Sequence, residues 1–204
     1  MKKILIYSLV LCLILFASSA FAANYFNKPR LAVRAFDNKT DNRSVPAGAI
    51  TEMMTTELYN SGLFSLMERE KFNYVREELE LGMSEFVDQS TAPQMGRVKG
   101  AEYTMTGAVT VYFYNTRGGV VPIPGLGGAG AAANTAYVTL DIRIIDNTTS
   151  EVVYAAAETG KANRAGGGLI TKYGGFAAGD HGGILASATR DAVMKHVKTM
   201  EERF

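Results

Sequence analysis

The residues of this chain that could do chemistry are few, and the most suggestive group is a run of glycines. Residues 125–130 read Gly-Leu-Gly-Gly-Ala-Gly and match the G-x-G-x-x-G pattern. A dinucleotide-binding loop needs that run between a strand and a helix, so that the phosphates meet the amides of the helix N-terminus. Here Val-Pro-Ile-Pro precedes the run and an alternating strand pattern follows it. We therefore expect a flexible hairpin tip here, and we predict no cofactor.

The two histidines, His181 and His196, are the next candidates. A zinc site usually needs three or four nitrogen, sulfur or carboxylate ligands at defined spacing. Asp180 and His181 form only a pair within a glycine-rich stretch, whereas His196 falls on the apolar side of a C-terminal helix. We predict a packed core histidine at position 196 and no metal site.

Glu77, Glu78 and Glu80 resemble paired carboxylates, but Arg76 and Lys71 are close in sequence. Charges at this spacing on a helix are typical of a solvated, salt-bridged surface. The chain has neither a G-x-S-x-G nor an H-E-x-x-H motif. We predict no catalytic residues and a protein that is not an enzyme. The alternative is an unrecognised periplasmic hydrolase or ligand-binding protein that would depend on Asp180 or His181.

The N-terminus has the three parts of a secretory signal peptide. Lys2 and Lys3 precede an apolar run from Ile4 to Phe16, and small residues lead to a cleavage site between Ala22 and Ala23. The apolar run is shorter than the roughly 20 residues of a membrane-spanning helix, although an uncleaved anchor is the alternative. We predict a signal peptide over residues 1–22 and export to the periplasm.

Cysteine and charge content exclude several functions of the mature chain. The single cysteine, Cys12, lies within the apolar run, so cleavage would remove it, and with it disulfides and thiol catalysis. Loss of Lys2 and Lys3 leaves 19 basic and 20 acidic side chains. A nearly neutral chain does not favour nucleic-acid binding, which needs a basic surface.

The pattern of apolar residues predicts an α/β fold, a mixed sheet with helices packed on it, in the order β-α-β-α-α-β-β-β-α. A single domain over residues 23–204 would contain two glycine-rich insertions, 117–134 and 160–183, as loops or mobile hairpins. The expected strands cover 31–36, 63–67, 103–113, 137–144 and 151–157, and the expected helices 46–61, 68–81, 91–98 and 184–202.

Five segments, taken in order, are similar to the CsgG family, the curli production assembly/transport component. Residues 31–40 (Leu-Ala-Val-Arg-Ala-Phe-Asp-Asn-Lys-Thr) resemble the family's first strand and its turn. Residues 62–69 (Gly-Leu-Phe-Ser-Leu-Met-Glu-Arg) resemble its helix stop, short strand and Glu-Arg pair. The resemblance continues through residues 75–78, 100–107 and 140–153.

This resemblance implies an envelope protein with an α/β periplasmic domain. In the curli secretion channel, nine such subunits form a ring, each contributes two β-hairpins to an outer-membrane pore, and a loop after the first strand narrows that pore. The family also implies a lipidated N-terminal cysteine, which is absent here because Cys12 lies within the signal peptide.

This chain differs from the curli secretion channel in two further features that a membrane pore would need. The segment from Asp37 to Pro46 is short and has no aromatic residue, so it offers no constriction residue. Pro122 and Pro124 would each remove a strand hydrogen-bond donor, and residues 158–183 include several charged side chains. We expect peripheral association with a membrane at most, not membrane-spanning strands.

These observations lead to one functional hypothesis and its main alternative. The chain would be a non-enzymatic cell-envelope protein that acts in curli-type assembly or secretion through contacts with other envelope or secretion proteins, as a homo-oligomer. The alternative is an outer-membrane oligomeric export channel for curli-like subunits. The candidate contact face is the aromatic run Tyr112, Phe113 and Tyr114.

Overall fold

The computed structural model describes residues 28–88, 90–93, 96, 98–124, 127–171, 174–175 and 181–204. The predicted signal peptide, its cleavage site at Ala22 and Ala23, and Cys12 lie outside the described residues.

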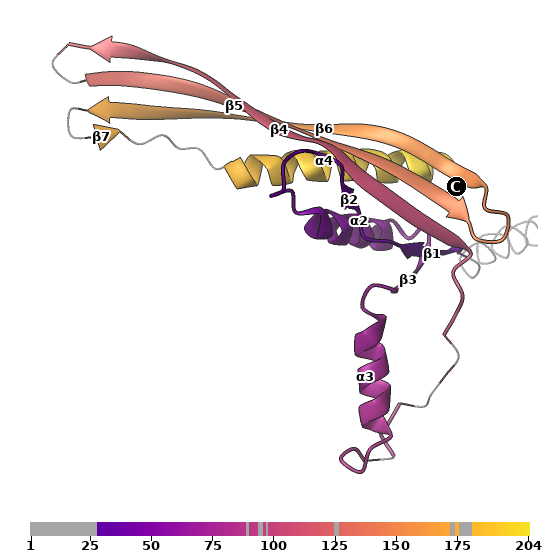
Figure 1. Cartoon of the computed structure of the whole chain (residues 1–204). Helices are drawn as coiled ribbons and strands as arrows, with labels where there is room; N and C mark the ends of the chain where they lie inside the picture. The colour runs from indigo at the N-terminus through magenta and orange to yellow at the C-terminus, as the bar shows by residue number, and fades with distance from the viewer. Residues whose placement is uncertain are drawn as a thin grey trace, which may run out of the picture.

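A mixed seven-stranded sheet forms the centre of the fold (Figure 1). Its strand order is β3-β1-β4-β5-β6-β7, and β2 pairs separately with β4. The N-terminal pairs, β1 with β3 and both β1 and β2 with β4, are parallel, whereas β4, β5, β6 and β7 pair antiparallel. The strands are β1 (Arg30–Val33), β2 (Asp37–Asn38), β3 (Ser65–Met67), β4 (Tyr103–Ile123), β5 (Gly127–Asp146), β6 (Val152–Thr171) and β7 (Gly174–Gly175). The predicted α/β class with a mixed sheet is confirmed.

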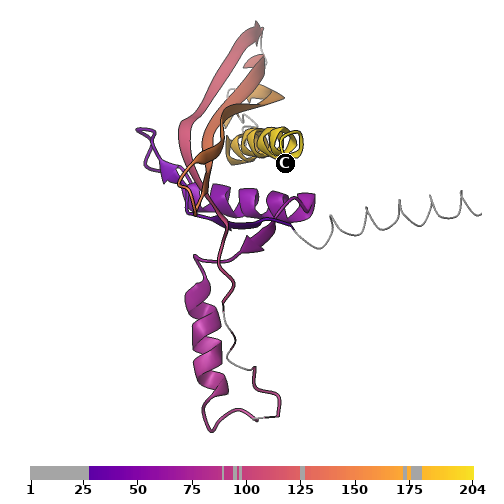
Figure 2. The same ribbon diagram turned by 90° about the vertical axis from the view of Figure 1, so that its right-hand side faces the viewer.

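Three helices accompany the sheet in the described part of the chain: α2 (Ala47–Ser61), α3 (Phe72–Gly82) and α4 (His181–Glu201). Helix α2 ends where expected, at Gly62, whose φ of 68° is a left-handed conformation that glycine adopts at low cost. Helices α2 and α4 lie on the same side of the sheet, whereas α3 projects away from the body (Figure 2).

The core lies between α4, α2 and the covered face of the sheet. Fully buried side chains of β5, such as Leu140 and Ile144, belong to one apolar cluster with Ala192, Val193 and other residues of α4. Glu57 interrupts the apolar stripe of α2 because it pairs with Arg190 of α4, with 2.6 Å between carboxylate and guanidinium. This ion pair ties the two helices together beside the core.

The predicted first strand, 31–36, is interrupted. Strand β1 ends at Val33, and Phe36 turns inward against Gly107, where an added Cβ would lie 2.6 Å from the ring. The short helix expected over 91–98 is wrong, since the residues described there form turns or irregular backbone.

The described parts of the glycine-rich stretches, predicted to be loops or mobile hairpins, are strands of antiparallel hairpins. Residues 117–123 and 127–134 continue β4 and β5, and residues 160–171 continue β6. Pro122 fits within β4 opposite Gly128 because β1 and β2 pair with β4 only up to Val109, and proline is tolerated in such an edge strand. The glycine and alanine residues thus build a long three-stranded sheet that extends beyond the helices (Figure 1).

Candidate functional site

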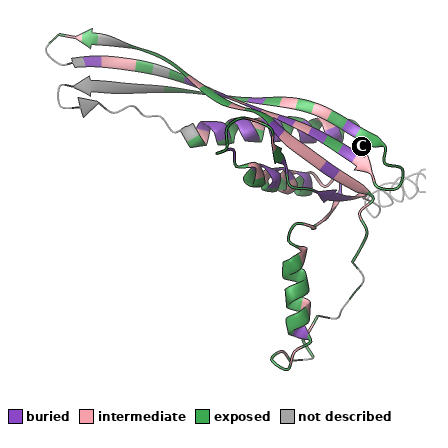
Figure 3. Ribbon diagram, in the orientation of Figure 1, coloured by how far each residue is buried: buried purple, intermediate pink, exposed green. Residues whose placement is uncertain are grey.

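The sheet has one covered and one open face, and the open face is the candidate functional site. Side chains alternate between the faces along each strand. On β5, Val138 and Leu140 are fully buried beneath α4, whereas Tyr137 and Thr139 between them are partly exposed. Figure 3 shows the same alternation of burial along the sheet.

Two cross-strand rows on the open face define what we term the open-face patch. In one row, Phe113 of β4 pairs with Tyr137 of β5, which pairs with Lys161 of β6. The neighbouring row consists of Val111, Thr139 and Thr159.

The patch combines apolar surface with a positive charge. Phe113 is 54% exposed and Val111 40% exposed. The Lys161 ammonium lies 5.5 Å from the centre of the Tyr137 ring, a cation–π arrangement. Thr139 and Thr159 share a hydrogen bond of 2.9 Å between their hydroxyls. An exposed aromatic beside a cation and hydroxyls is suited to contact with another protein, since aromatic residues are enriched at interfaces.

The structure separates the three aromatic residues predicted as a contact face. Phe113 lies on the open face, whereas Tyr112 and Tyr114 belong to the covered side of β4 by strand alternation. Tyr112 packs against the core, and burial raises the pKa of its hydroxyl. Tyr137 and Lys161 could not be identified from the sequence, because only the strand register places them beside Phe113.

His196 is a core residue, as predicted. It is fully buried, with Nε2 2.9 Å from the Leu140 carbonyl oxygen and Nδ1 3.1 Å from the Tyr154 hydroxyl. Burial lowers the pKa of His196 from the ordinary value of 6.5. His181 begins α4, and Asp180 lies outside the described residues. Within the described ranges, no three His, Cys, Asp or Glu side chains are grouped to hold a metal ion.

The described residues of the glycine run and the glutamates singled out in the sequence lie on a strand and on a helix, respectively. Gly127, Gly128 and Gly130 of the G-x-G-x-x-G run belong to β5, while Gly125 and Leu126 lie outside the described residues. The element after the run is therefore a strand, not the helix that a dinucleotide site needs. The carboxylates of α3 are exposed, as expected, and Arg76 pairs with Glu80 at 3.6 Å.

The turn after β2, from Asn38 to Asn42, is held by hydrogen bonds of its own side chains. The Asn38 carboxamide oxygen accepts hydrogen bonds from the backbone N–H and the hydroxyl of Thr40, at 2.9 and 2.7 Å. The Asn38 amide also donates to the Asn42 carbonyl at 2.7 Å. These residues, part of the family-like opening segment, therefore shape a loop.

The fold is α/β, with a mixed sheet that is covered by helices on one face and open on the other. Residues 19–204 match the family model described as "Curli production assembly/transport component CsgG". The chain belongs to this CsgG family.

Distant relatives are found among curated proteins and solved structures. A Neisseria meningitidis serogroup B protein, named as a candidate lipoprotein, is 25% identical over 185 residues, which cover 84% of this chain and 76% of the relative. The PelC dodecamer from Paraburkholderia phytofirmans is 16% identical, with a TM-score of 0.42 and coverage of 83% and 87% of the two chains. The hypothetical protein CT253 from Chlamydia trachomatis is 9% identical, with a TM-score of 0.47 and coverage of 87% and 98%. The family assignment rests on the matched family model.

Proposed function

We propose that this chain is a periplasmic, non-enzymatic protein of curli-type assembly or secretion that acts as a homo-oligomer through protein–protein contacts. The observation that carries the proposal is the open-face patch, where Phe113, Tyr137 and Lys161 stand in one cross-strand row and no described helix covers them. Membership of the CsgG family supports a role in the cell envelope. The signal peptide would direct export and be removed by cleavage between Ala22 and Ala23.

The experiment is fractionation of cells that express the full-length chain, followed by intact-mass measurement of the recovered protein. We expect release with the soluble periplasm at the mass of a chain that starts at Ala23, and a multiple of that mass in solution under native conditions. Recovery from the cytoplasm at full mass would contradict the proposed location. A monomer at all concentrations would contradict the oligomer.

The outer-membrane export channel is the second candidate, and the length of the strands favours it. Strands β4, β5 and β6 have 21, 20 and 20 residues, whereas strands in globular proteins usually have five or six. No helix in the described ranges is long and apolar enough to cross a membrane. Retention in the outer-membrane fraction until detergent is added would favour the channel over the soluble assembly protein.

A further inference from the structure

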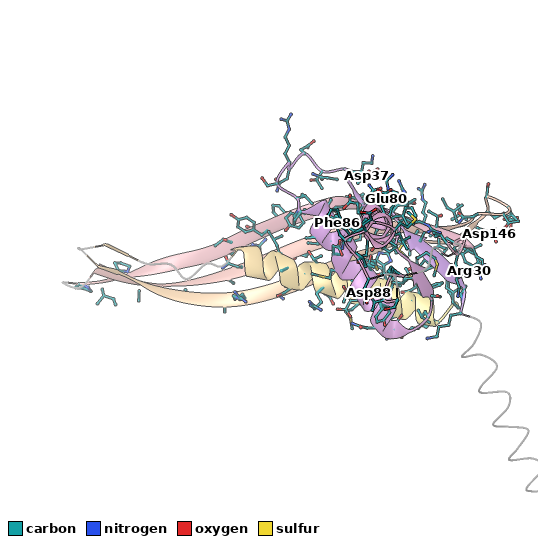
Figure 4. All side chains as sticks on the ribbon, turned by 90° about the horizontal axis from the view of Figure 1, so that it is seen from below. Arg30, Asp37, Glu80, Phe86, Asp88 and Asp146 are labelled. Carbon is teal, nitrogen blue, oxygen red and sulfur yellow. The ribbon has the colours of Figure 1, made fainter. Side chains whose placement is uncertain are left out.

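An arm projects from the body and exposes apolar side chains. It consists of α3 and the described residues that return from it to the sheet (83–88, 90–93, 96 and 98), and it hangs below the body in Figure 1. Within α3 only Gly82 is buried. Phe86, near the free end of the arm, is 92% exposed, and Met83 is 59% exposed. Figure 4 looks onto this free end, where Glu80, Phe86 and Asp88 are labelled.

The arm is also acidic. Residues 72–88 contain four glutamates and one aspartate but only one basic residue, Arg76. Asp88 accepts hydrogen bonds from the backbone N–H and hydroxyl of Ser90, which lower its pKa and keep its carboxylate charged at neutral pH. The exposed Phe86 therefore lies between two acidic residues, Glu85 and Asp88.

A hollow of opposite charge lies where the arm joins the body. This basal groove has a volume of about 650 Å³, and the described residues that line it include three cations and no carboxylate. Arg69 is held in position by donation to the Lys99 carbonyl at 2.6 Å, and the ion pair of Arg34 with Glu70 is exposed and 3.6 Å long. The lining residues that bear on the contact are Arg34, Arg69, Phe72, Val98 and Lys99.

We propose that the tip of the arm of one copy docks into the basal groove of a second copy, with Phe86 against Phe72 and Val98. Glu85 and Asp88 would then face Arg34, Arg69 and Lys99, which combines an aromatic anchor with complementary charge. This inference rests on the proposed homo-oligomer and adds a pair of contact surfaces, the arm tip and the basal groove, to the open-face patch.

The geometry of the arm makes this contact intermolecular and head-to-tail. An 11-residue helix is about 16 Å long, so α3 carries its free end away from the groove at its own base. Two arms would repel each other tip to tip, since each is acidic. A contact between two different surfaces repeats from copy to copy and closes into a ring when the rotation allows it.

Engineered disulfides test the pairing, because the mature chain would have no cysteine of its own. We expect Phe86→Cys and Val98→Cys variants to cross-link when mixed under mild oxidation, and to stay uncross-linked when each is incubated alone. Cross-linking of Phe86→Cys with itself would overturn the proposal in favour of a tip-to-tip contact. A mixture without cross-links, in a sample that is oligomeric, would overturn it as well.

Charge reversal provides an independent test by sedimentation. Glu85→Lys and Lys99→Glu should each weaken self-association about tenfold or more, and the double variant should recover most of the loss. Tyr59→Ser, which changes a 73% exposed aromatic on α2, serves as the control and should not alter the mass. If all variants keep the wild-type mass, the oligomer stands and this interface is overturned. If the wild type is monomeric, both the proposed homo-oligomer and this interface are overturned.

Discussion

The Tyr154 hydroxyl donates a hydrogen bond to Nδ1 of the buried His196 at 3.1 Å. The other ring nitrogen, Nε2, lies 2.9 Å from the Leu140 carbonyl, which can only accept. The neutral ring therefore carries its proton on Nε2 and accepts at Nδ1. Burial, with a smaller contribution from Glu158, raises the pKa of Tyr154 to about 12, so its hydroxyl remains a donor at neutral pH. The pair joins α4 to strands β5 and β6.

Removal of this hydroxyl should destabilise the fold. Tyr154→Phe leaves Nδ1 of His196 buried without a donor, at a cost of about 1–3 kcal/mol in the free energy of unfolding. Urea denaturation of the mature domain measures the change. Tyr74→Phe, at a hydroxyl on the exposed surface of α3, is the control and should be nearly neutral. Equal stability of wild type and Tyr154→Phe would mean that the hydrogen bond contributes nothing.

Stability should also fall in mild acid because of His196. The folded-state pKa of His196 is lowered, chiefly by burial, although Glu158, Asp141 and the Leu140 carbonyl act in the opposite direction. Below pH 6.5 the unfolded chain therefore binds more protons at this residue than the folded chain. The stabilising contribution is complete above pH 6.5 and decreases as the pH falls through the folded-state pKa.

The histidine contribution can be isolated by comparison with a variant that does not titrate. We expect the unfolding free energy of His196→Gln to vary less between pH 7.5 and pH 5 than that of the wild type. The same slope in both proteins would assign the acid sensitivity to other groups. The variant should be less stable than wild type at pH 7.5, since the geometry of both hydrogen bonds changes.

Gly160 should tolerate no side chain. A Cβ on this residue would collide with the Ala188 carbonyl oxygen and the Ala192 backbone nitrogen of α4. Backbone atoms cannot move aside as a flexible side chain can, so Gly160→Ala should cost about 3 kcal/mol or more. Gly119→Ala, on β4 where an added Cβ meets no atom within 4 Å, should change stability by less than about 0.5 kcal/mol. Thermal unfolding of both variants provides the comparison.

A substitution in the open-face patch should weaken binding to partner proteins but leave the fold intact. Phe113→Ser removes a half-exposed ring, so we expect an unchanged far-UV spectrum and a change in unfolding free energy of less than about 1 kcal/mol. Cross-linking in cells should then recover fewer envelope partners than with wild type. Met194→Ser, at a 51% exposed site on α4, is the matched control. Equal recovery from all three proteins would remove the patch from the proposed contact surfaces.

The sequence was most informative where local chemistry determines structure. Gly62 ends α2 as its left-handed φ requires, and the apolar period of α4 correctly placed His196 in the core. For the glycine-rich stretches the sequence left loops and hairpins as alternatives, because glycine and alanine have low intrinsic preference for strands, whereas in the structure a long ladder of neighbours holds them. The open-face patch depends on cross-strand register, which no single segment encodes.

Side chains of α4 cap the edge of β6 near Thr159 and Lys161, where no neighbouring strand pairs with it in the described part of the chain. Asp191 accepts a hydrogen bond from the Lys161 backbone N–H at 2.9 Å, and Lys195 donates to the Thr159 carbonyl at 2.8 Å. The two side chains also form an ion pair at 2.9 Å, and hydrogen bonding to Lys195 is the main cause of the lowered pKa of Asp191. Unpaired strand edges promote association with other strands, so this cap should limit aggregation.

Asp191→Ala should therefore increase aggregation more than it lowers stability. The exposed ion pair itself contributes less than about 1 kcal/mol. The Lys161 amide, however, loses its acceptor, and hydrogen exchange at that amide should accelerate. Light scattering at 37 °C should rise faster for Asp191→Ala than for Glu80→Ala, which removes an exposed ion pair of the same i, i+4 spacing on α3. Equal scattering by the two variants, with an unchanged exchange rate at Lys161, would show that the edge is protected in some other way.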